Sequence, residues 1–292
     1  MHTLTPTESS RLDVCLSSLL SLPRAVCSSL IRSGHVHLND LPCKKASTIV
    51  KSSDTIIIMK DELPQITHKR PNIVPVNIHF ESLYEDSDIL VINKPSGLSV
   101  HPGNGHQKDP TLAHALLYRY PFLSTVGEEH RPGIVHRLDK FTSGLMVIAK
   151  SSTAYTHLKH QFYTHAVKKG YLAWVYGNIS SDFLTLDSPL SRHTKKRHLQ
   201  WVNPLGKPAV THISVIKRVQ TKTLIEARPI TGRTHQIRVH LAAIQHPVVG
   251  DPEYSRYPHP NGQQLQAIHL SFTHPTSQKQ LSFHLQIGRA HV

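Results

Sequence analysis

One carboxylate within a basic stretch is the side chain of this chain best suited to chemistry. Residues 136–140 read His-Arg-Leu-Asp-Lys, so Asp139 lies between the cations Arg137 and Lys140. A neighbouring cation favours the ionised carboxylate, which can act as a nucleophile or as a base. The same pattern is also typical of a surface ion pair without a chemical role. The rest of the chain must decide between these interpretations.

Apolar runs on both sides of Asp139 indicate that its loop is attached to a buried core. Residues 145–149 form an apolar run bounded by Gly144 and Lys150, which predicts a buried strand. Side chains that perform chemistry commonly lie on loops held by such rigid elements. We therefore expect Asp139 to have a fixed position.

Two further segments carry candidate functional residues. Residues 170–177 form an aromatic and apolar run that predicts a strand with Tyr171 near its start. Residues 231–241 turn into a predicted helix in which Ile237 faces inward and Arg238 lies off the apolar stripe. Taken alone, Tyr171 fits a core residue, and the arginines of the helix fit surface cations.

A basic loop is predicted at residues 192–197, which read Arg-His-Thr-Lys-Lys-Arg. Such a run is usually a solvated loop, but it also suits contact with a phosphate backbone. Its candidate phosphate-binding residues are Lys195, Lys196 and Arg197.

Composition restricts the class of partner. The 292 residues carry a formal net charge of +14 with histidine neutral, which favours a polyanion such as nucleic acid. The three cysteines lack Cys-x-x-Cys spacing, so we expect reduced thiols in a cytoplasmic protein. The sequence lacks a membrane-spanning run, zinc-ligand spacing, a Walker loop and a Gly-x-Ser-x-Gly motif. We expect no membrane partner, no metal and no nucleotide cofactor.

The chain is predicted to divide into a small module and a larger domain. Residues 11–60 predict two helices, with Arg24 and Arg32 outward on the second, followed by short strands. The Pro-rich residues 61–76 predict a linker, and residues 77–286 predict a domain of alternating strands and short helices.

These motifs together resemble the RluA-type pseudouridine synthases. The resemblance covers residues 131–145, the Asn-Lys-Pro at 93–95, the Lys-Gly-Tyr strand, residues 232–240, the Gly-Asp-Pro at 250–252 and residues 269–275. Residues 11–60 resemble the S4 RNA-binding domain. The resemblance implies an α+β fold: a small S4-like α/β module, then a mixed, mainly antiparallel central sheet with flanking helices and a central cleft.

The resemblance also implies the reaction and the roles of particular residues. Uridine in RNA would be isomerised by cleavage of its glycosidic bond and formation of a C5–C1′ bond, with no cofactor. Asp139, Tyr171 and Arg238 match the catalytic set, in which the arginine pairs with the aspartate and the tyrosine stacks against the base and is a candidate for proton removal at C5. The atom that Asp139 attacks first stays open. Arg137 is the candidate to fill the space left by the flipped base, while Ile237 and Leu138 are expected to line the uracil pocket. The expected RNA-binding residues are Lys140, Arg233, Arg24, Arg32, Lys195, Lys196 and Arg197.

Within the family, the amino-acid sequences of residues 131–140 and 206–211 are most similar to those of the large-subunit ribosomal RNA branch. The expected partner is 23S rRNA or a precursor of the large ribosomal subunit, with the helix 69 loop as target. Three alternatives stay open: a synthase acting on other rRNA sites, a synthase acting on tRNA, and an RNA-binding assembly factor without catalysis. A glycosidase is disfavoured, because the sequence offers no credible second carboxylate for that reaction. Residues 287–292 are expected to be a non-native tail.

Overall fold

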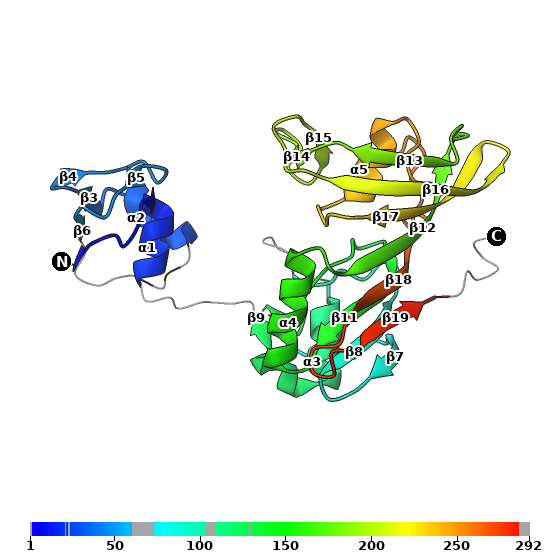
Figure 1. Cartoon of the computed structure of the whole chain (residues 1–292), viewed down its shortest axis with the longest axis horizontal. Helices are drawn as coiled ribbons and strands as arrows, with labels where there is room; N and C mark the ends of the chain where they lie inside the picture. Colours follow the sequence, from blue (N-terminus) through cyan, green and yellow to red (C-terminus); the bar gives the residue numbers. More distant parts are fainter. Residues whose placement is uncertain are drawn as a thin grey trace. The chain divides into compact units, whose positions relative to one another are not determined.

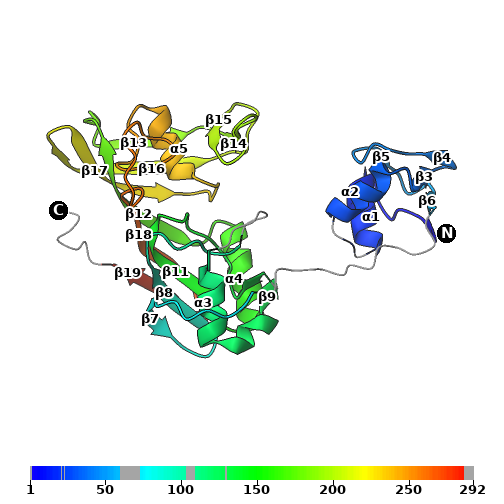
Figure 2. The same cartoon turned by 180° about the vertical axis from the view of Figure 1, so that it is seen from behind.

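The computed structural model describes residues 2–20, 22, 24–59, 73–102, 109–128 and 130–285. The chain divides into two compact units, the N-terminal unit (Met1–Lys69) and the C-terminal unit (Arg70–Val292). The described residues of each unit form their own hydrophobic cores. Figures 1 and 2 show the helices and strands of the two units.

The N-terminal unit packs two short helices against a small antiparallel sheet with strand order β1-β6-β3-β4. Leu12, Leu16 and Ile31 of the helices are fully buried in this core. The turn between β3 and β4 places Asn39 and Asp40 at φ of 50° and 69°, as a tight hairpin of type I′ requires. The elements are β1 (His2–Leu4), β2 (Ser10–Arg11), α1 (Leu12–Leu20), α2 (Arg24–Arg32), β3 (Val36–Leu38), β4 (Leu41–Pro42), β5 (Ile49–Val50) and β6 (Ile56–Ile58).

Both helices predicted for this unit are confirmed, and Arg24 and Arg32 are exposed as expected. The structure adds strand β1, which lies before the predicted start at residue 11. Thr3 pairs with Ile57, so this segment completes one edge of the sheet. A segment of three residues is too short for its hydrophobic periodicity to predict a strand.

A mixed nine-stranded sheet crosses the described part of the C-terminal unit, in the order β13-β16-β17-β12-β18-β11-β8-β7, with β19 paired to β18. Only the β11–β18 pair in this sheet, within the described ranges, is parallel. The strands are β7 (Glu81–Glu85), β8 (Ile89–Lys94), β11 (Ser143–Ala149), β12 (Lys168–Tyr176), β13 (Phe183–Asp187), β16 (Val210–Val219), β17 (Lys222–Pro229), β18 (Leu265–Thr273) and β19 (Gln280–His284).

Two hydrophobic cores lie along this sheet. Helices α3 and α4 cover the half that contains β8 and β11, whereas α5 packs on the half that contains β16 and β17 (Figure 1). Tyr171 of β12 packs against both cores, so the middle of the sheet joins them. The remaining elements are α3 (Leu112–Arg119), the 3₁₀ helix η1 (Pro121–Thr125), β9 (Gly127–Glu128), β10 (Arg131–Pro132), α4 (Ser152–Tyr163), β14 (Leu190–Arg192), β15 (Gln200–Val202) and α5 (Gln236–Ala243).

The predicted α+β fold with a mixed, mainly antiparallel sheet is confirmed, and the predicted strands at 145–149 and 170–177 are β11 and β12. Part of the predicted linker belongs to the C-terminal unit, because Ile73 packs on its core and the Val76 N–H donates to the His114 carbonyl. Residues 61–72 and the predicted tail at 287–292 lie outside the described residues. None of the described helices is long and apolar enough to cross a membrane.

Candidate active site

The loop that carries Asp139 is fixed at both ends by the sheet. Strand β11 follows the loop, and its Gly144 has a φ of 114° and lies against the backbone of Ala267 in β18. Any larger residue at position 144 would clash with this backbone, so a close parallel approach of two strands sets the end of the loop. Beneath the loop, Lys94 of β8 is fully buried, and its Nζ donates to three carbonyls, including that of Lys140 at 3.2 Å.

Arg238 of α5 is the ion-pair partner of Asp139. Its Nη1 donates to Asp139 Oδ2 at 2.9 Å, and its side chain is only 3% exposed. On its other side, Arg238 makes two bonds to Asp251, Nε to Oδ2 at 2.7 Å and Nη2 to Oδ1 at 2.8 Å. Nη2 also donates to Glu253 Oε2 at 2.6 Å. A buried guanidinium paired with a buried carboxylate has a fixed orientation, so Arg238 presents one N–H to Asp139 from a prepared position.

One expectation about these charges is therefore corrected, and another agrees with the structure. Arg238 was expected to lie off the apolar face of its helix, but it is buried. Its pairing with Asp251 permits burial of the cation. The pairing of Asp139 with Arg238 that the resemblance implied is present, across 99 residues of the chain, while Lys140 pairs with Asp109 at 3.6 Å. Burial alone lowers the pKa of Arg238, but its hydrogen bonds and the nearby carboxylates raise the pKa overall, so the cation persists.

His235 occupies the other side of Asp139. Its Nε2 is 3.9 Å from Asp139 Oδ1, and its Nδ1 is 2.8 Å from the Tyr254 hydroxyl. That hydroxyl accepts the N–H of Gln200, which leaves its own proton to donate to Nδ1. Burial lowers the pKa of His235, with the charge of Asp139 acting in the opposite direction. The ring is thus favoured as a neutral imidazole beside the carboxylate.

A cavity of about 550 Å³ opens beside Asp139. Tyr171 and Ile237 contribute to its wall together with Leu138, and Lys169 contributes a cation. The buried apolar wall beside a carboxylate can accept a flat, uncharged ring whose attached sugar meets Asp139. The predicted set of Asp139, Tyr171, Arg238, Leu138, Ile237, Arg137 and Arg233 lines this one cavity.

The ionisable residues of this cavity are strongly affected by burial. Burial, followed by the charge of Asp139, raises the pKa of Tyr171, so its phenol stays protonated at neutral pH. Burial lowers the pKa of Lys169 to about 8 and that of Lys94, beneath the loop, to about 7. A phenol that is already protonated has no free base form at neutral pH, so this environment favours Tyr171 as a wall and a hydrogen-bond donor.

A second cavity of about 540 Å³ shares Asp139, Leu138, His235 and Arg238 with the first. Its wall adds three cations, Arg131 of β10, Lys140 of the Asp139 loop and Arg192 at the end of β14. The predicted RNA-binding residues are thus divided among several places. Arg137 and Lys140 are exposed at the cavities, Lys195, Lys196 and Arg197 are exposed between β14 and β15, and Arg24 and Arg32 belong to the N-terminal unit.

Sequence reasoning gave no site role to Asp251, Glu253, His235, Lys94 or Lys169. The signals available were the Gly-Asp-Pro at 250–252 and the His-Gln-Ile-Arg segment at 235–238. Neither reveals that a carboxylate 13 residues after Arg238 holds its guanidinium, because that contact depends on the chain path beyond α5.

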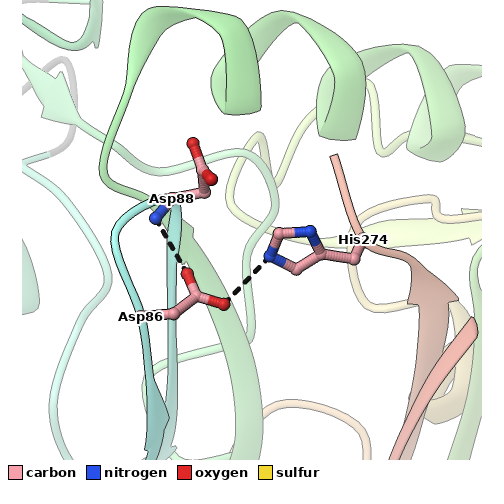
Figure 3. Close-up of side chains that lie close together, drawn as sticks. All are labelled: Asp86, Asp88 and His274. Carbon is pink, nitrogen blue, oxygen red and sulfur yellow. Dashed lines mark hydrogen bonds and ion pairs between the residues drawn. The ribbon is translucent and has the colours of Figure 1, made fainter. Parts of the chain in front are cut away.

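A separate acidic cluster consists of Asp86, Asp88 and His274, whose ligand atoms lie close enough to hold a metal ion (Figure 3). The ring nitrogens of His274 already make hydrogen bonds within the protein. His274 Nδ1 accepts two backbone N–H groups, from Thr276 and Ser277, so the proton of the neutral ring lies on Nε2, which donates to Asp86 Oδ2 at 2.9 Å. The cluster therefore acts as a hydrogen-bonded clasp between the β7–β8 turn and the segment after β18.

The geometry can now be compared with known proteins. A family model described as RNA pseudouridylate synthase matches residues 88–243, and an S4 domain model matches residues 10–56. An "Uncharacterized RNA pseudouridine synthase" of Aquifex aeolicus (strain VF5) is 39% identical, with 96% of this chain and 90% of the relative covered. The "Ribosomal large subunit pseudouridine synthase D" of Escherichia coli (strain K12) is 38% identical, with 95% of this chain and 87% of the relative covered.

Solved structures agree with this family. "Human RNA Pseudouridylate Synthase Domain Containing 1" superimposes with a TM-score of 0.59 at 27% identity, covering 71% of this chain and 83% of that chain. "Human RNA Pseudouridylate Synthase Domain Containing 4" gives a TM-score of 0.54 at 25% identity, covering 72% of this chain and 90% of that chain.

Proposed function

This chain belongs to the RNA pseudouridylate synthase family, and we propose that its substrate is large-subunit ribosomal RNA, with uridines of the helix 69 loop as targets. Relatives named for the large ribosomal subunit are 38% identical over nearly the whole chain. The S4 domain and the net charge of +14 also favour a structured RNA. We also propose that this activity takes place in the cytoplasm.

The observation that carries the proposed mechanism is the buried contact between Asp139 and Arg238 at the edge of an apolar cavity. Arg238 orients the carboxylate through Oδ2, with Oδ1 left for the ribose of an everted uridine. The uracil lies against Tyr171 and Ile237 while its N1–C1′ bond breaks, the base rotates and a C5–C1′ bond forms; the C5 proton is then released to solvent and N1 takes up a proton. Arg137, exposed at the mouth of the cavity, enters the stack in place of the base.

Mapping of pseudouridine tests the proposed substrate. Ribosomal RNA from a strain that lacks this gene should lose carbodiimide-reactive positions in the helix 69 loop, and expression of the intact gene should restore them. Restoration should fail with Asp139→Asn. Loss of reactive positions in tRNA alone, with rRNA unchanged, would contradict the proposal.

We also propose that the N-terminal unit adds affinity for RNA and takes no part in the chemistry. Deletion of residues 1–62 should weaken binding of an rRNA transcript and raise KM, with a smaller effect on kcat. Filter binding and single-turnover kinetics measure the two effects separately. Unchanged affinity would refute this role.

A further inference from the structure

The second cavity has a charge pattern that the chemistry at Asp139 does not require. Its two carboxylates, Asp139 and Glu253, each lie within 2.9 Å of an Arg238 nitrogen, and the single positive charge of this guanidinium offsets only one of their two negative charges. Four further cationic side chains line the same cavity, contributed by β10, the Asp139 loop and the end of β14: Arg131, Arg137, Lys140 and Arg192. An anionic ligand would complete this arrangement.

Arg131 is the member of this set with the clearest unmet bonding capacity. Its Nε is buried and has no hydrogen-bond partner among the described residues. Its contact with a carboxylate is long, 3.8 Å from Nη1 to Glu128 Oε2. Buried N–H groups nearly always have an acceptor in a working protein, so a ligand oxygen is expected beside Arg131.

The two cavities differ in chemistry, and each suits a different part of a nucleotide. The first has the aromatic and aliphatic wall that suits a base, with Tyr171 and Ile237. The second offers arginines, which bind phosphate through planar paired N–H groups. The two cavities meet at Asp139 and Leu138, so one RNA strand can occupy both.

We propose that the second cavity is the binding site for the phosphodiester group that adjoins the everted uridine, with Arg131 and Arg192 as its main ligands. This inference rests on the proposed function, since it assigns a further part of the same RNA substrate. The bound phosphate fixes the ribose of the target uridine relative to Asp139.

The test uses the full-length protein and a stem-loop RNA that contains the mapped target uridine. In one RNA the phosphodiester on the 5′ side of this uridine is replaced by a neutral methylphosphonate, and in another RNA the one on the 3′ side. One of these replacements should lower kcat/KM of the wild type by at least about tenfold, the effect expected for loss of a charge-assisted hydrogen bond.

Arg131→Gln and Arg192→Gln, alone and combined, show whether the cavity is responsible. The combined variant should lower kcat/KM for the unmodified RNA by at least about tenfold. With this variant, the methylphosphonate RNA that affected the wild type should lower kcat/KM by less than about a further twofold. Arg228→Gln is the matched control, because Arg228 is an exposed arginine of β17 outside both cavities. It should retain the full methylphosphonate effect.

Each outcome decides one question. If neither methylphosphonate changes kcat/KM of the wild type by more than about twofold, the phosphodiester site is wrong. An equal methylphosphonate effect in the wild type and the combined variant, with both melting at the same temperature, would place the contact elsewhere and also overturn the inference. If the unmodified RNA is not converted by the wild type, it is the proposed substrate that fails.

Discussion

Two clusters of the C-terminal unit contain carboxylates and a histidine, yet their surroundings differ. At the clasp, Asp86 Oδ1 accepts the N–H groups of Asp88 and Ile89, and its Oδ2 accepts from Tyr84 and His274. At the candidate active site, Asp139 Oδ2 accepts from Arg238, while Oδ1 lies 3.9 Å from His235 on the wall of two cavities.

The difference shows that the two clusters are distinguished by how many hydrogen bonds the carboxylate oxygens already accept from the protein. A structural carboxylate has both oxygens occupied, whereas a reactive one keeps an oxygen available. A carboxylate whose lone pairs are filled by fixed donors stabilises the fold, because removal of the partners is costly. A carboxylate that is oriented on one side and open on the other can meet a substrate.

Asp139→Asn should lower kcat by at least about 10³-fold, because the amide keeps the size of the side chain and lacks its negative charge. Release of tritium from RNA labelled at uridine C5 measures the rate. Affinity for rRNA should persist, since the variant removes a negative charge beside phosphates. If Asp139→Asn turned over at the rate of the wild type, Asp139 would not be the catalytic residue.

Asp251→Asn should reduce kcat by about 10²-fold, because Arg238 loses the fully buried carboxylate that orients it toward Asp139. The free energy of unfolding should also fall by about 3 kcal/mol, since a buried ion pair is broken.

Two further measurements separate positioning from simple loss of stability in Asp251→Asn. Single-turnover kinetics well below the melting temperature should show a lower kcat with KM nearly unchanged. Glu253→Gln serves as a milder comparison, because Glu253 is 27% exposed and makes one bond to Arg238. A destabilised Asp251→Asn protein with normal kcat would reduce Asp251 to a structural role.

Asp86→Asn should lower the free energy of unfolding by about 1–2 kcal/mol, because the clasp loses hydrogen bonds to its carboxylate. Its kcat/KM should equal that of the wild type. Urea unfolding and the tritium assay measure these quantities. A loss of turnover in a folded Asp86→Asn protein would show that the two clusters are coupled, contrary to the contrast drawn here.

The pH dependence of stability provides a finer test of the clasp. Burial alone raises the pKa of Asp86, but the donated N–H and O–H groups lower the pKa overall below its ordinary value of 3.8. A lowered pKa means that the carboxylate stabilises the fold above pH 3.8, and that this contribution is lost as the pH falls further. The difference in unfolding free energy between wild type and Asp86→Asn should shrink below that pH.

Metal removal should have the smallest effect. Because His274 Nε2 donates its proton to Asp86 and Nδ1 accepts backbone N–H groups, the ring offers no lone pair to an ion. Excess EDTA should leave the melting temperature unchanged, and so should added zinc. A rise in melting temperature with zinc that Asp86→Asn abolishes would instead identify a metal site.

The sequence determined the elements that local patterns encode. The apolar run at 145–149 predicted strand β11, and the helical spacing of Leu12 and Leu16 predicted α1, because side-chain periodicity follows directly from strand and helix geometry. Asp139, Tyr171 and Arg238 were also selected from the sequence, on motifs within short contiguous segments.

The family resemblance implied that Asp139 and Arg238 pair, but only the tertiary structure showed which further side chains hold Arg238 in place. Arg238 contacts Asp139 across 99 positions of the chain, and Asp251 and Glu253 reach the same guanidinium after the chain has left α5. The helical pattern of α5 predicted an exposed Arg238, because hydrophobic periodicity does not register an ion pair that compensates for burial. Likewise, the composition indicated a polyanionic partner, but the packing of distant segments around two adjoining cavities decided where its base and its phosphate can lie.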